Sequence, residues 1–134
     1  MREARHVLKK EKLAIALGAA PEYKTVVWRG FELYVRPILG AREANCFFDS
    51  VMSACYDASR DLFFPEMVDF AFRAAVLVWY AGVELPESVE EQWRVVYASD
   101  LYDRVLAEIC GAQVAALSRA VELCMGGLAA KMKL

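Results

Sequence analysis

The sequence has a single histidine, His6, and its four cysteines are not arranged in pairs. Cys46, Cys55, Cys110 and Cys124 lie 9, 55 and 14 residues apart, and none of them forms a C-x-x-C motif. Structural zinc sites generally use cysteines or histidines paired at short spacing, so we predict no metal, no cofactor and no disulfide. In a reducing compartment these thiols are most simply small core residues.

Long apolar runs are also missing. The longest extends from Ala74 to Val83 and stops at Glu84, whereas a membrane span needs about 20 apolar residues. Residues 1–12 are mostly charged and no apolar region follows them, so they do not resemble a secretory signal. We therefore expect no membrane association and a cytoplasmic protein.

The side-chain combinations that acid–base or nucleophilic catalysis requires are not evident. His6 lies among lysines and arginines in a segment that we expect to be an exposed helix. Asp57 and Asp61, or Asp100 and Asp103, are close enough in sequence to hold a divalent ion, but they belong to no recognised ligand pattern. Helix caps or solvated turns explain them more simply. We expect a protein that is not an enzyme, and a small enzyme with an unrecognised site is the least favoured alternative.

The sequence also has no excess of positive charge, since its formal net charge is −2. This argues against a nucleic-acid-binding protein. The charge is nevertheless uneven. Residues 1–12 contain five basic and two acidic side chains, whereas residues 84–108 contain seven acidic and two basic ones. Two interpretations stay open: these are two solvated helix faces, or the two regions attract each other between copies of the chain.

What the sequence does have is length for one domain and an excess of apolar residues. Its 134 residues fit a single domain with its own core. The hydrophobic fraction is 58%, above the typical value of about 45–50%. The excess indicates either an unusually full core or an apolar surface that a partner covers.

The periodicities predict a mainly α fold of the α+β type, with about five to six helices and one N-terminal β-hairpin. We divide the chain into a basic N-terminal helix or extension at residues 1–22 and one helical domain at residues 23–134. The charged segment 3–18 should be helical and should end near Gly18, ahead of Pro21.

The predicted hairpin covers residues 23–36. Two β-branched and aromatic runs flank Arg29-Gly30, and a two-residue turn there pairs Trp28 with Phe31 and, further along, Val26 with Leu33. This register places one apolar face toward the helices. Gly30 should supply the positive φ of the turn.

Helical spacing of apolar residues predicts an amphipathic helix at residues 41–58. The next helix should start at Pro65 and, being apolar nearly all round, should be the central one. We expect it to end at Gly82 and to contain an Asp69–Arg73 pair. A further helix should begin at Ser88, which stands at capping-box spacing from Glu91.

The last helix shows a stripe at heptad spacing, formed by Val114, Leu117, Val121, Cys124 and Leu128. An internal helix can cover this seam, or a second chain can. The second interpretation makes Leu117 and Val121 candidate partner-binding residues and makes self-association to a homo-oligomer an expectation.

Aromatic side chains exceed what one small core obviously needs. They can simply form a rich core. Alternatively, some of them line a groove for a protein partner, since aromatic residues are enriched at interfaces. Under this second interpretation the candidate partner-binding residues are Trp28, Tyr34, Phe63 and Phe64.

Several stretches resemble a known family of small proteins. Residues 30–39 (GFELYVRPIL) resemble the pattern G-x-E-I-x-V-K-x-Y-L. Residues 62–77 (LFFPEMVDFAFRAAVL), followed by 80–86 (YAGVELP), resemble Y-L-P-E-x-K-D-F-x-x-R/K-x-x-x-L-x-Y-Y-A-x-x-x-L-P, and residues 96–100 (VYASD) resemble L-V-Y-x-T-D. These patterns are similar to those of small proteins from the structural and tail-morphogenesis gene region of tailed phages of Gram-positive hosts.

The resemblance covers roughly residues 23–110 and does not include the basic N-terminal segment. It implies a non-enzymatic phage morphogenesis protein in the host cytoplasm, similar to a tail-assembly chaperone, that acts on a phage structural protein through protein–protein contacts. The family pattern carries no catalytic residues. An alternative of another class is a phage-encoded inhibitor of host defence, similar to an anti-CRISPR protein, that binds a host protein.

Overall fold

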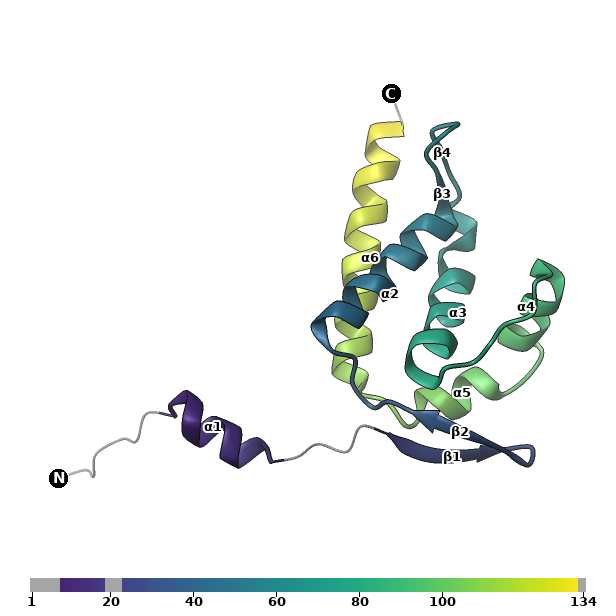
Figure 1. Ribbon diagram of the computed structural model, residues 1–134. Helices are drawn as coiled ribbons and strands as arrows, with labels where there is room; N and C mark the ends of the chain where they lie inside the picture. The colour runs from purple at the N-terminus through teal and green to yellow at the C-terminus, as the bar shows by residue number, and fades with distance from the viewer. Residues whose placement is uncertain (1–7, 19–22, 133–134) are drawn as a thin grey trace.

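The structure is a computed structural model that describes residues 8–18 and 23–132, with the side chains of the last helix described as far as Leu128. In chain order the elements are α1 (Lys10–Leu17), β1 (Lys24–Trp28), β2 (Phe31–Val35), α2 (Ala41–Cys55), β3 (Tyr56–Asp57), β4 (Leu62–Phe63), the 3-10 turn η1 (Pro65–Met67), α3 (Val68–Ala81), α4 (Val89–Tyr97), α5 (Leu101–Leu106) and α6 (Gly111–Met132). The described part is therefore mainly α, with six α-helices and an N-terminal β-hairpin, as predicted (Figure 1).

The β1–β2 hairpin has the predicted register, with Trp28 opposite Phe31 and Val26 opposite Leu33. Arg29 and Gly30 have φ values of 50° and 83°, and a type I′ turn requires this positive φ at both central positions. Val26 is buried against the helices, as expected. Phe31 is 69% exposed although it shares that face, because it lies beside the turn, at the free end of the hairpin.

α2 ends at Cys55, three residues before its predicted end at Ala58, so that prediction was wrong. Tyr56 adopts extended φ and ψ values, and β3 then pairs with β4 in a second, two-residue hairpin. The backbone N–H of Phe64 donates to the Cys55 carbonyl over 2.7 Å, which closes the hairpin onto the end of α2. Here the pairing of two short neighbouring strands overrides a helical apolar spacing.

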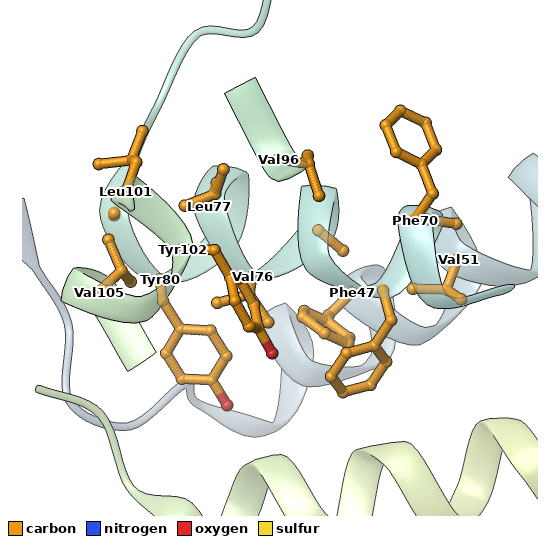
Figure 2. Close-up of a cluster of buried hydrophobic side chains, with 14 of the residues drawn as sticks. Phe47, Val51, Phe70, Val76, Leu77, Tyr80, Val96, Leu101, Tyr102 and Val105 are labelled. Carbon is orange, nitrogen blue, oxygen red and sulfur yellow. The ribbon is translucent and has the colours of Figure 1, made fainter. Parts of the chain in front are cut away.

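α3 is the central helix, as predicted, and it packs against α2, α4, α5 and β2. Its inward side chains form the core that Figure 2 shows, together with side chains from α2, α4 and α5. Gly82 ends the helix at a φ of 62°: its N–H donates to the Val78 carbonyl, and the N–H of Val83 donates to the Leu77 carbonyl, over 3.1 and 3.0 Å. These two bonds satisfy carbonyls that the end of the helix leaves free.

Two smaller predictions about helix ends and pairs are also confirmed. The Ser88 hydroxyl accepts a hydrogen bond from the backbone N–H of Glu91 over 3.3 Å, so Ser88 is the N-cap of α4. Asp69 and Arg73, one turn apart on α3, form an ion pair of 2.9 Å. Pro65 does start the next helical segment, although its first turn is the 3-10 turn η1.

The stripe on α6 faces the core of its own chain and packs mainly on α2. Val121 is only 1% exposed, and Val114, Leu117 and Leu128 pack against the buried cluster. Cys124 was wrongly assigned to this stripe: it is exposed, and Met125 is buried instead. A straight helix of 3.6 residues per turn drifts away from a strict heptad, so the inward position after Val121 moves by one residue.

A half-buried amide, that of Gln113, joins the core to the segment before α2. Tyr80, which is fully buried, donates its hydroxyl to Gln113 Oε1 over 2.6 Å. The same Gln113 Oε1 accepts from the Leu39 backbone N–H, and Gln113 Nε2 donates to the Leu39 carbonyl, each over 2.9 Å. One side chain of α6 thus connects α3 to the segment between β2 and α2.

α1 carries no buried residue, and Figure 1 shows it apart from the other helices. It ends at Gly18, whose φ of 65° and backbone N–H bond to Ala14 confirm the predicted end of the first helix. His6 and the rest of residues 3–7 lie outside the described residues. None of the helices described is both long and apolar enough to span a membrane.

Candidate interaction surfaces

The six residues that we predicted to bind a partner do not form one surface. Trp28 and Tyr34 lie on opposite faces of the β1–β2 hairpin, with Trp28 half-buried and Tyr34 exposed. Tyr34 contacts Tyr23 edge to face, with 6.4 Å between ring centroids. Phe63 and Phe64 belong to the second hairpin and the residue after it, at the other end of the helical body (Figure 1).

Most of these side chains also take part in the internal packing. Phe63 is half-buried and packs against the core, and Phe64 is half-buried at the N-cap of η1. Leu117 packs against the core, and Val121 is inside it. For these two residues of α6, the internal alternative is the one that the structure shows.

Trp28 lines an open cleft of about 470 Å³ between the tip of the β1–β2 hairpin and α4, which we call the hairpin–α4 cleft. The apolar side chains that line it are Trp28, Val83, Pro86, Val95, Ala98 and Leu101, and the charged ones are Arg29, Glu84, Glu91 and Arg94. An apolar floor with charges of both signs at the rim is a composition that protein interfaces also show.

The position of Trp28 in the cleft is set by Asp100, the residue before α5. The indole Nε1–H donates to Asp100 Oδ1 over 2.8 Å, and Arg29 lies 3.6 Å from the same oxygen. Arg29 also lies over the indole ring, 4.7 Å from its centroid. The indole hydrogen bond, helped by nearby arginines, lowers the pKa of Asp100 below its usual range. Asp100 is therefore charged at neutral pH and orients the indole.

Along a neighbouring face of α4, Val89, Trp93 and Tyr97 follow each other at a spacing of four residues, and all three are exposed. We call these three residues the α4 ridge. Trp93 stacks on Phe70 of α3 with 5.1 Å between centroids, and it lies 4.6 Å from the ring of Tyr97. The inner edge of the ridge is thus fixed to the core, while its outer edge faces solvent.

Charged groups of α3 support the end of this ridge. The Tyr97 hydroxyl donates to Asp69 Oδ2, and the guanidinium of Arg73 lies over both Tyr97 and Tyr102, 5.5 and 4.6 Å from their centroids. Burial, followed by the hydrogen bond to Asp69, raises the pKa of Tyr97 to about 12. This phenol stays protonated at neutral pH and acts as a hydrogen-bond donor.

Of the aspartates considered above as an ion site, Asp57 and Asp61 take part in contacts within the second hairpin. Asp57 accepts from the Ser59 hydroxyl over 2.7 Å and from Arg60 Nε over 2.8 Å, and these bonds lower its pKa. Asp61 accepts from the Tyr56 hydroxyl. Within the part of the chain that the structure describes, no three His, Cys, Asp or Glu side chains gather in an arrangement that can hold a metal ion.

The candidate residues predicted from the sequence did not include Phe31, Gln113 or the α4 ridge, although Phe31, Trp93 and Tyr97 belong to the aromatic excess noted there. The ridge did have a signal: an apolar spacing of four residues on a helix of nine, of which only Val96 is buried. Gln113 had none, because its partners are 33 and 74 residues away in the sequence. Neither a protein-family model, nor a curated protein, nor a solved structure was found to match this chain.

Proposed function

We propose that this chain is a non-enzymatic morphogenesis protein of a tailed phage, similar to a tail-assembly chaperone, that binds a phage structural protein in the host cytoplasm. The observation that carries the proposal is the hairpin–α4 cleft, where an apolar floor and a rim of two arginines and two glutamates stand open beside an exposed aromatic tip. Tryptophan and arginine in such a setting are the side chains that most often dominate protein-binding energy.

The cleft is open and can receive a segment of another polypeptide. Its floor is apolar, so it favours a partner segment with aliphatic or aromatic side chains. Arg29 and Arg94 at the rim can pair with acidic side chains of that segment, and Glu84 and Glu91 with basic ones. The sequence resemblance supplies the class of partner, since small proteins of the tail-morphogenesis region act on structural proteins of the phage.

Site-specific photocrosslinking tests this proposal. A photoreactive phenylalanine analogue in place of Phe31 stands beside the cleft, and the same analogue in place of Leu123 on α6 is the control. The two positions are matched in exposure, at 69% and 67%. In cells infected with the phage that encodes the chain, we expect the Phe31 position to capture a phage structural protein and the Leu123 position to capture none.

Other outcomes separate the alternatives. If the Phe31 position captures a host defence protein, the chain is an inhibitor of host defence and the morphogenesis proposal is wrong. Capture of no protein from Phe31, or equal capture from both positions, would contradict the assignment of the cleft as a binding site. The genes beside the coding sequence give an independent test, since tail-tube and tape-measure genes favour morphogenesis and a cluster of anti-defence genes favours inhibition.

A further inference from the structure

α1 has no partner among the described residues of its own chain. It is eight residues long and has no buried residue, and Ile15 and Leu17 are 80% and 73% exposed. A helix of this length is not stable in water by itself, because helices shorter than about 12–15 residues gain too few hydrogen bonds to offset nucleation. Its apolar side chains therefore call for a surface to pack against.

The polarity of α1 changes along its length. Lys9, Lys10 and Lys12 stand at its N-terminal end, and the segment from Leu13 to Leu17 (LAIAL) is entirely apolar. Leu13 and Leu17 lie one turn apart, on the same side as Lys10. A matching surface thus needs acidic groups at one end and apolar groups at the other.

α4 offers this arrangement. Four acidic residues surround its N-terminal end, namely Glu84, Glu87, Glu90 and Glu91, and Arg94 is the one cation between Glu84 and Tyr97. The α4 ridge continues from there with Trp93 and Tyr97 exposed toward the C-terminal end. A shallow groove of about 360 Å³, lined by Val89, Glu90, Trp93 and Arg94, runs along the first part of the ridge.

We propose that α1 of one copy binds the α4 ridge of a second copy, with the two helices parallel. In this direction the lysines of α1 face the acidic end of α4, and Leu13 and Leu17 contact Trp93 and Tyr97. The lengths agree, since eight and nine residues give helices of about 12 and 13 Å. The opposite charges of the two segments are what point to a second copy of this chain.

The contact is directional, because each copy presents α1 on one side and the ridge on another. Association of this kind is heterologous and continues until a ring closes or a chain of copies grows. One short helix makes a small interface, below the roughly 1,200 Å² of a standard one, so the association is weak and depends on concentration. Exposed ion pairs also make it weaken as salt rises.

Charge reversal tests the pairing. One variant carries Lys9→Glu, Lys10→Glu and Lys12→Glu, and the other carries Glu87→Lys and Glu90→Lys. All five side chains are exposed, so both variants should fold, as their circular dichroism will show. In sedimentation at about 10–500 µM and about 50 mM salt, we expect the wild type to self-associate and each variant alone to be monomeric. A 1:1 mixture of the two variants should associate again, because each reversed segment meets its complement.

A matched apolar control tests the packing. Leu13→Ser with Leu17→Ser, which removes both apolar contacts of α1 with the ridge, should weaken self-association at least tenfold, whereas Leu123→Ser, at the exposed face of α6, should leave it unchanged. A wild type that is monomeric throughout would overturn the proposal, and this includes a monomer in which α1 binds the ridge of its own chain. Failure of the variant mixture to associate, or equal weakening by Leu123→Ser, would overturn it too. The inference does not depend on the proposed function: the ridge residues Val89, Trp93 and Tyr97 do not line the hairpin–α4 cleft, although Arg94 lies beside both, and the two experiments can fail separately.

Discussion

Replacing Gln113 by leucine is expected to destabilise the protein by about 3–5 kcal/mol, although leucine fills nearly the same volume. The glutamine makes three hydrogen bonds, to the Tyr80 hydroxyl and to the N–H and carbonyl of Leu39. Tyr80 is completely buried and Leu39 is nearly so. Each buried polar group left without a partner costs about 1–3 kcal/mol, and water that enters from the half-exposed side of Gln113 keeps the total in the lower part of the summed range.

Urea and thermal unfolding measure this difference. For a chain of this size, we expect the unfolding midpoint to fall by roughly 10–20 °C. Tyr80→Phe alone should cost only about 1 kcal/mol, because Gln113 keeps its two bonds to Leu39. In the Gln113→Leu background, the same Tyr80→Phe change should cost nothing or even stabilise, because the hydroxyl it removes no longer has a partner.

Gln113→Leu and Tyr80→Phe are therefore expected to be strongly coupled in their effects on the free energy of unfolding. If Gln113→Leu costs less than about 1 kcal/mol, or if the two changes are additive within about 0.5 kcal/mol, the three bonds do not connect α3 and α6 to the segment before α2 as described. Gln113→Glu is a further control of the same shape. At neutral pH the glutamate keeps both acceptor contacts and loses the donor to the Leu39 carbonyl. When low pH protonates the carboxyl, the donor returns, and the stability difference between this variant and the wild type should become smaller.

The remaining predictions concern the hairpin, the cysteines and metal content. Trp28→Ala should lower the free energy of unfolding by about 2–3 kcal/mol, since a half-buried indole and its hydrogen bond to Asp100 are lost. If the unfolding midpoint does not change but partner binding is lost, Trp28 is a binding residue and not a core residue. In Trp28→Phe, which keeps a ring but not the donor, NMR titration should show the pKa of Asp100 rising, and an unchanged pKa would exclude the indole as its cause. Burial raises the pKa of Cys55 from 9.0 to about 11, so above pH 9 the unfolded chain loses the thiol proton while the folded chain keeps it. The free energy of unfolding of the wild type should therefore fall between pH 9 and 11, and it should fall less in Cys55→Ala, which has no thiol. A thiol reagent should modify the exposed Cys46 and Cys124 quickly and Cys55 only on unfolding. Elemental analysis and mass spectrometry should find neither stoichiometric zinc nor a disulfide, and either one would contradict the inference from cysteine spacing.

The hairpin, the central helix and several helix ends could be predicted from the sequence. A side-chain period of two fixes the register of β1 and β2 once the turn is placed at Arg29-Gly30. An apolar surface on every side of α3 leaves it no position but the centre. Ser88 and Gly82 act within one turn of the helices that they begin and end, so neighbouring residues suffice to identify them.

The predictions failed where distant residues compete with local patterns. The apolar spacing of α2 continues to Ala58, but pairing with Leu62 and Phe63 turns Tyr56 and Asp57 into a strand. On α6, Cys124 fits the heptad, whereas the curvature of the core surface selects Met125. Gln113 reads as an ordinary polar position, and only the approach of Tyr80 and Leu39 makes it a connection between three segments.

Periodicity, turns and caps act over a few residues, so the first hairpin, the main helices and most of their inward faces could be predicted, whereas the second hairpin could not. The high apolar and aromatic content of the sequence left two interpretations open, a rich core or a surface that a partner covers. Which of them remain exposed was decided only by the tertiary structure. Phe70 is buried while Trp93, stacked upon it, is open to solvent, and Val121 is covered by the core of its own chain while Ile15 is covered by nothing in the described part of it. Exposure depends on which distant elements pack over a side chain, and local spacing carries no record of that.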